Sequence, residues 1–153
     1  MFNNCFTLTA IPQLDTSAVT NMGAMFQTCY SLTTVPQIDT SAVTTMNNMF
    51  NGCYSLTAIP QLDTSMAKDM NNMFNNCYSL AAIVFNCSVA GWAGYAVSLK
   101  GCSLGHAAIV AFFDSLPTIT SAKAITLTGN PGVSELTAAE KAVATRKGWT
   151  LTL

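Results

Sequence analysis

The sequence predicts an α/β solenoid: a right-handed stack of short units, with a parallel β-sheet on one face and short helices or turns on the other. Three observations predict it. The dipeptide Met-Phe recurs every 24 residues, at Met1, Met25, Met49 and Met73. Apolar residues make up 50% of the 153 residues, whereas charged residues make up 8%. The final third alternates strand-like and helix-like segments, which is typical of parallel strands joined by helices.

The whole 24-residue unit recurs with this period. The shared slots hold Cys5, Cys29, Cys53 and Cys77; Leu8, Leu32, Leu56 and Leu80; Pro12, Pro36 and Pro60; and Asp15, Asp39 and Asp63. A unit this short cannot enclose a core alone, so neighbouring units must stack. We expect one continuous domain: four repeats over residues 1–85, the last one degenerate, an irregular connection over 86–96, and longer strand-helix repeats over 97–153 that form a C-terminal cap.

Each repeat is expected to contain a brief strand and a short helical segment. The strands are predicted at residues 8–11, 32–35, 56–59 and 80–84, and in the first three a proline ends the strand. The next segment carries apolar residues at i, i+3, i+4 and i+7, one face of a helical turn. We expect these Met, Phe and Cys side chains to form the core. In the first full unit they are Met22, Met25, Phe26 and Cys29.

The C-terminal third predicts strands at 97–99, 124–127 and 149–153. A helix is predicted over 104–116, because helical apolar spacing there stops at Pro117. The string Thr137-Ala138-Ala139-Glu140 is a capping box that opens a second helix, which runs to Lys147 with Gly148 as its stop. Residues Gly91–Gly94 are expected to form part of the irregular connection.

The residues resemble a known family. The string MFQTCYSLTTVPQIDTSAVTTMNNMF over Met25–Phe50 resembles the BspA-type leucine-rich repeats, in the variety of Mycoplasma-type lipoprotein repeats and of surface and phage proteins of gut Bacteroidales. The closing string LTGNPGVSELTAAEKAVATRKGWTLTL resembles the end of similar proteins. The resemblance implies a leucine-rich-repeat-like fold, a role in adhesion or binding, and a location that is secreted, on a cell surface or on a virion.

Charge and motifs argue against several function classes. The formal net charge of −1 gives no electrostatic footprint for nucleic acid, and no apolar run is long enough to insert into a membrane. His106 is the only histidine, so two-histidine metal motifs are excluded, and a capping or surface role is favoured over catalysis. No glycine-rich phosphate loop or nucleophile elbow occurs. We therefore expect no enzyme activity, no metal and no cofactor.

Two repeated polar or reactive rows each allow two interpretations. Asp15, Asp39 and Asp63 would form a carboxylate ladder suited to calcium, or each would accept hydrogen bonds in its own Asp-Thr-Ser turn, which we favour. The cysteine row has a spacing that would allow disulfides, but its apolar slot favours free, buried thiols.

The expected function is a non-enzymatic binding or adhesion module that presents a repeated, uncharged surface to a glycan or protein ligand. The candidate ligand-binding residues are Thr9, Thr33, Thr57, Gln13, Gln37, Gln61, Tyr30, Tyr54 and Tyr78. Aromatic and amide rows supply flat contact area together with hydrogen bonds. The alternative is a structural spacer or display repeat with no ligand of its own. Self-association is also expected through the N-terminal edge, where Phe2, Leu8 and Ile11 are apolar.

Overall fold

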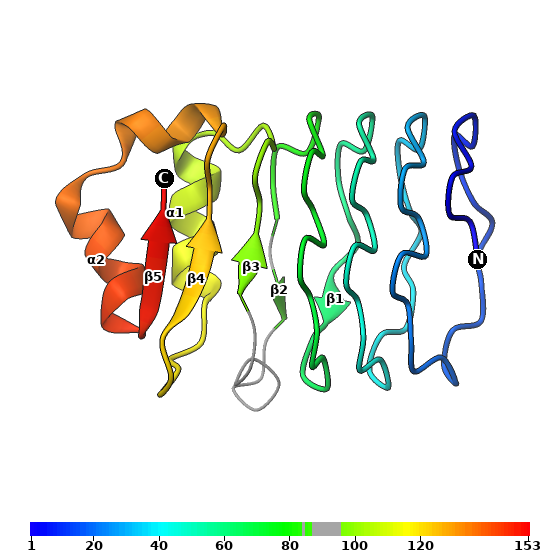
Figure 1. The fold of residues 1–153 in the computed structure, drawn as a ribbon, viewed down its shortest axis with the longest axis horizontal. Helices are drawn as coiled ribbons and strands as arrows, with labels where there is room; N and C mark the ends of the chain where they lie inside the picture. The colour runs from blue at the N-terminus through cyan, green and yellow to red at the C-terminus, as the bar shows by residue number, and fades with distance from the viewer. Residues whose placement is uncertain (84, 87–95) are drawn as a thin grey trace.

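The computed structural model describes residues 1–83, 85–86 and 96–153. The 24-residue units form successive coils that lie side by side, from the N-terminus to the larger elements of the C-terminal third (Figure 1). Isolated parallel bridges join Asn21 to Thr45 and Thr45 to Asp69. Residues 24 positions apart are therefore direct neighbours across adjacent coils. The predicted connection at Gly91–Gly94 lies outside the described residues.

The segments 8–11, 32–35 and 56–59 are not strands, contrary to the prediction. Only sparse bonds join them: Thr33 N donates to Thr9 O at 3.1 Å and Thr57 N donates to Thr33 O at 3.2 Å. The proline that follows each segment lacks the N–H that would continue the pairing. Residues 80–83 are also not a strand, and residue 84 is outside the described residues. The parallel pair in this region is instead β1 (Leu62–Asp63) with β2 (Phe85–Asn86).

Consecutive β-turns, rather than the predicted helical turn, form the segment Met22–Cys29. Met25 N donates to Met22 O at 3.2 Å, and an equivalent bond closes the next turn. The third residue of each turn, Ala24 and Thr28, has a positive φ of 55° and 58°. Asparagine and glycine adopt this conformation at low cost. Later repeats place Asn48, Gly52, Asn72 and Asn76 in these positions. The predicted face is nevertheless buried, because consecutive turns also direct positions three apart to one side.

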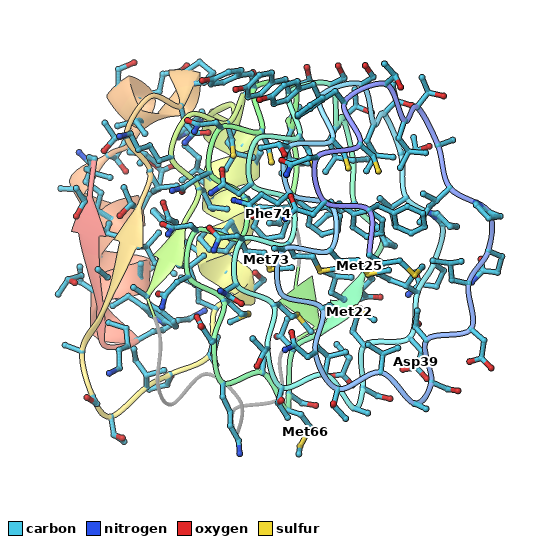
Figure 2. The ribbon with its side chains drawn as sticks, turned by 45° about the vertical axis from the view of Figure 1, so that its right-hand side comes forward. Met22, Met25, Asp39, Met66, Met73 and Phe74 are labelled. Atoms are coloured by element: carbon cyan, nitrogen blue, oxygen red, sulfur yellow. The ribbon has the colours of Figure 1, made fainter. Side chains whose placement is uncertain are left out.

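Stacked phenylalanines form the centre of the repeat core. Ring centroids lie 5.6 Å apart between Phe2 and Phe26, 5.5 Å between Phe26 and Phe50, and 5.7 Å between Phe50 and Phe74. The last three rings are fully buried. Figure 2 shows Phe74 and Met22 lying within the stack of coils, whereas Met66 lies at its lower edge. The core is therefore built from rows that continue from one coil to the next.

The C-terminal third forms a three-stranded parallel sheet, in the order β3 (Val97–Ser98), β4 (Lys123–Thr126) and β5 (Trp149–Thr152). These strands lie at the three predicted segments, with no end shifted by more than one residue. In the register of this sheet, Val97 is paired with Ile125, and Ile125 is paired with Leu151.

Two helices and a 3-10 turn complete this third: α1 (His106–Ser115), η1 (Pro131–Glu135) and α2 (Ala138–Arg146). Thr137 and Glu140 form the predicted capping box at the start of α2. Gly148 follows this helix with a φ of 93°, and a side chain there would meet the carbonyl of Ile119. Trp149 is buried and its Nε1 donates to Pro117 O at 3.0 Å, which anchors β5 to the segment after α1.

Candidate binding surface

The predicted tyrosines form one exposed aromatic row along the coils. Ring centroids lie 4.6 Å apart between Tyr30 and Tyr54, with planes 7° apart, and 5.0 Å apart between Tyr54 and Tyr78. Phe6 extends the row, since its ring is stacked on Tyr30 at 5.0 Å. We call these four residues the aromatic row. Phe6 was not among the predicted site residues, although subtracting the period from Tyr30 gives its position.

Stacking changes what the aromatic row offers to a ligand. The tyrosines are 36%, 39% and 53% exposed from Tyr30 to Tyr78, yet their ring faces contact each other. Along the row, a ligand can therefore contact the edges and the hydroxyl groups of the tyrosine rings. The flat contact area expected from the sequence is therefore largely used within the protein.

The threonine row is exposed and also bonds along the stack. Thr33 Oγ1 donates to Thr9 O at 3.2 Å, and Thr57 Oγ1 donates to Thr33 O at 3.3 Å. These bonds supplement the backbone bonds between the same residues. The hydroxyl protons of Thr33 and Thr57 thus hold neighbouring coils together, and their oxygens are left as acceptors.

The glutamine row lines a shallow hollow of about 560 Å³, which we call the glutamine groove. Gln13 Nε2 donates to Gln37 O at 2.6 Å, and Gln37 Nε2 donates to Gln61 O at 2.9 Å. The other lining residues are Ile38, Asp39, Thr40, Ser41 and Asp63. The structure thus brings the predicted glutamines together with two aspartates. Among the described residues that line the groove there is no tyrosine and none of the three predicted threonines.

The aspartates beside the groove confirm the local-turn interpretation. Asp39 Oδ1 accepts hydrogen bonds from the hydroxyl and the backbone N–H of Ser41, at 2.7 and 2.9 Å. These bonds hold the pKa of Asp39 below its ordinary value, the hydroxyl bond contributing most. Asp15 Oδ1 accepts the same two bonds from Ser17, and Asp63 Oδ1 accepts from the backbone N–H of Ser65 at 2.8 Å. No three His, Cys, Asp or Glu residues within the described ranges form a group suited to a metal ion.

The cysteine row has free thiols in the described part of the chain, and Cys87 lies outside it. Cys29, Cys53 and Cys77 are buried, whereas Cys5 at the first coil is half-buried. Each buried thiol donates to a phenylalanine carbonyl of the preceding coil, at 3.0 to 3.1 Å. Burial raises the pKa of Cys53 to about 12. The buried members of this row are a structural part of the core.

His106 joins two helices. Its Nε2 lies 3.0 Å from Glu140 Oε1, so the ring of the first residue of α1 contacts the first turn of α2. The pKa of Glu140 is lowered to about 2, mainly by the hydrogen bond that its carboxylate accepts from the Thr137 backbone, with further bonds from the Thr137 hydroxyl and His106. This contact agrees with the surface role that the sequence favoured for His106.

The first coil presents an apolar edge, which we call the N-terminal edge. Here a hollow of about 290 Å³ is lined by Met1, Leu14, Val19, Met22 and Met25, together with Asp15, Thr16, Asn21 and Gly23. Phe6 and Met1 are 50% and 82% exposed. The outer side of the phenylalanine stack ends here at Phe2, which is only partly buried.

The geometry defines a repeat protein whose aligned side chains form continuous rows across neighbouring coils. A family model described as "Mycoplasma protein of unknown function, DUF285" matches residues 1–101, and the chain belongs to this family. No curated protein and no solved structure matches the chain. Within the described residues, neither helix has the length and apolar character needed to cross a membrane.

Proposed function

We propose that this chain is a non-enzymatic binding module of solenoid type, and that the glutamine groove is its ligand-binding surface. One observation carries the proposal: three successive repeats place Gln13, Gln37 and Gln61 around a single hollow together with Asp39 and Asp63. A surface assembled from equivalent positions of several repeats suits an extended ligand, because each coil contributes one similar contact.

The groove is rich in hydrogen-bond acceptors. The Nε2 donors of Gln13 and Gln37 are bonded to backbone carbonyls of the next coil, which leaves their amide oxygens as acceptors. Asp39 is ionised at neutral pH, as an ordinary aspartate is, and its lowered pKa keeps it so at more acidic pH; an ionised carboxylate only accepts. A matching ligand therefore supplies donors, as do the hydroxyl groups of a glycan or the N–H groups of a protein.

The shape of the groove supports the same class of ligand. It is a shallow, open hollow, unlike the deep apolar pockets that enclose small molecules. Such a surface suits a neutral glycan or an extended protein segment, bound by several weak contacts. The setting implied by the resemblance, a cell-surface or phage tail protein, is part of this proposal.

A structural spacer is the second candidate, and the stacking bonds favour it. The hydroxyl protons of Thr33 and Thr57 and the amide donors of Gln13 and Gln37 all join neighbouring coils. The faces of the tyrosines are likewise used in stacking. Each row therefore joins neighbouring coils, and this structural role explains the row without any ligand.

The test is binding to an array of neutral glycans and to a library of peptides that contain lysine and arginine. Asp39→Asn keeps one oxygen to accept the Ser41 bonds but replaces the other acceptor by a donor and removes the charge. We expect this variant to bind at least about tenfold more weakly, since a hydrogen bond to a charged group contributes about 1.5–3 kcal/mol. Asp114→Asn, an exposed aspartate on α1, is the control. Absence of binding on both arrays would favour the spacer.

A further inference from the structure

The exposed tyrosines are held in contact by the coils on which they lie. Tyr30 and Tyr54 are stacked with their ring planes 7° apart and their centroids 4.6 Å apart, while more than a third of each residue stays accessible. The separation is at the short end of the 4.5–7 Å range of aromatic pairs. Two phenol groups on the protein surface are therefore held together without a covalent link.

The backbone on both sides of Tyr54 fixes this arrangement. Before it, Cys53 is fully buried and its thiol donates to Phe26 O at 3.0 Å. After it, Ser55 N donates to Tyr30 O at 3.2 Å. These contacts fix the backbone positions of the two tyrosines relative to each other, so each ring meets its neighbour at a high effective concentration.

We propose that Tyr30 and Tyr54 form a site of oxidative cross-linking, where a peroxidase that uses hydrogen peroxide joins the two rings as dityrosine. Each phenol gives one electron to the peroxidase and its hydroxyl proton to water, which leaves two phenoxyl radicals. A carbon–carbon bond then forms between the ring carbons next to the hydroxyl groups. Each of these two carbons then loses its hydrogen as a proton. One proton is added to each of the two oxygens, which restores both hydroxyl groups.

The electrons and atoms of this reaction balance. Two tyrosines lose two electrons and two hydrogen ions in total, and one hydrogen peroxide accepts them and becomes two waters. The product is a covalent bond between the second and third repeats. Such a bond restricts the unfolded chain much as a disulfide does, so it stabilises the stacked state.

The surroundings direct the oxidant to the tyrosines. Cys53 and Cys77 are fully buried, and their raised pKa keeps them as thiols, which are poor nucleophiles toward peroxide. Met1 and Met66 are exposed and take up oxygen from peroxide, a separate reaction that adds mass. Cross-linking instead removes two hydrogen atoms, so mass spectrometry separates the two products.

The pair Tyr30–Tyr54 is the preferred site. Tyr54 and Tyr78 are farther apart, at 5.0 Å, and their planes are tilted by 24°. Tyr54 belongs to both pairs and has two ring carbons next to its hydroxyl, so a limiting amount of peroxide is needed to stop the reaction after the first cross-link. Phenylalanine is a matched replacement for these tyrosines, since Phe6 occupies the equivalent slot of the first repeat and stacks in the same way.

The experiment treats the folded chain with horseradish-type peroxidase and limiting peroxide, then measures dityrosine fluorescence and maps the linked peptides. Every protein carries Tyr95→Phe, because that tyrosine lies outside the described residues and would complicate the readout. We expect monomeric, internally linked chains. Proximity predicts that Tyr54→Phe lowers the internal yield at least about tenfold, whereas Tyr78→Phe leaves it within about twofold.

Unfolding provides the second arm of the test. In urea the stacked coils are lost, so the internal link at Tyr30–Tyr54 should fall and links between molecules should dominate. The proposal is overturned if Tyr54→Phe leaves the internal yield unchanged, if urea leaves it unchanged, or if the folded chain gives only dimers. Binding by the glutamine groove has no part in these readouts, so the two proposals succeed or fail separately.

Discussion

The thiol of Cys53 donates a hydrogen bond to the backbone carbonyl of Phe26 in the preceding coil, over 3.0 Å. The side chain of Cys53 is fully buried, and burial raises its pKa from 9.0 to about 12. Cys102 makes the corresponding contact with Phe74, and its pKa is likewise raised to about 12. The folded protein thus retains thiol protons that the unfolded chain releases at lower pH.

These thiols predict a loss of stability in alkali. Below about pH 9 both states keep the thiol protons, so the stabilisation is complete; between about pH 9 and pH 12 only the folded state keeps them, so the free energy of unfolding falls as pH rises. Urea titrations at pH 7 and pH 10 measure this difference. Cys53→Val should reduce it, because the variant has one fewer group to titrate. An identical pH dependence in Cys53→Val would contradict the assignment.

At turn positions with a positive φ, introducing a glycine should stabilise the protein, and removing one should destabilise it. Ala24 has a φ of 55°, so Ala24→Gly should stabilise the protein by about 0.5–1 kcal/mol, because the strain of an alanine there exceeds the entropy cost of glycine. Gly52 has a φ of 76°, and Gly52→Ala should destabilise by about 1 kcal/mol. Chemical denaturation measures the free energy of unfolding of both variants. A change of the same sign in both would contradict the prediction.

Replacing the buried Asn130 should greatly lower the stability of the protein. Its side chain is buried, accepts from Leu104 N at 3.0 Å, and donates to the carbonyls of Leu99 and Leu127, both at 2.8 Å. Asn130→Ala leaves these three backbone groups without that partner, so we expect a cost of about 3 kcal/mol. Thr128→Ala, an exposed neighbour, should change the free energy of unfolding by less than about 0.5 kcal/mol. Similar costs for the two variants would argue against this role.

The N-terminal edge predicts reversible self-association. Phe6 is 50% exposed at this edge, and burying its free ring face against a second copy would remove apolar surface from water. Phe6→Lys should raise the dissociation constant about tenfold or more, since losing an aromatic anchor costs at least about 1.4 kcal/mol. Met66→Lys is the control, because Met66 is similarly exposed but lies away from that edge (Figure 2). Sedimentation velocity over a concentration series measures both, and equal effects would exclude the edge.

The period of 24 predicted the rows because a stacked coil makes residue i+24 the neighbour of residue i. Burial of Phe26, Phe50 and Phe74 and the alignment of the tyrosines both follow from that relationship. The same relationship places Phe6 in the aromatic row. It was not predicted there because phenylalanine lacks the hydroxyl group shared by the other three members. Stacking of ring faces was not predictable, because the period does not define how the side chains turn.

Backbone conformation within a coil was predicted less well. Apolar residues three and four apart are common to a helical turn and to consecutive β-turns, so burial alone does not separate them. Asparagine and glycine at Asn48, Gly52 and Asn72 were the available signal, because they favour a positive φ that a helix lacks. In the C-terminal third, by contrast, the capping box and Gly148 identified the ends of α2, because these residues act locally.

The direction of the hydrogen bonds between coils has an electrostatic consequence. Between residues 46 and 52, four backbone N–H groups donate toward the later coil: those of Met46, Asn48, Phe50 and Gly52. Three N–H groups farther along donate toward the earlier coil: those of Ser55, Thr57 and Lys68. The peptide dipoles of the two groups oppose each other and largely cancel, unlike those of an α-helix, which add along its axis. Lengthening the stack by further repeats therefore builds up little field at either end.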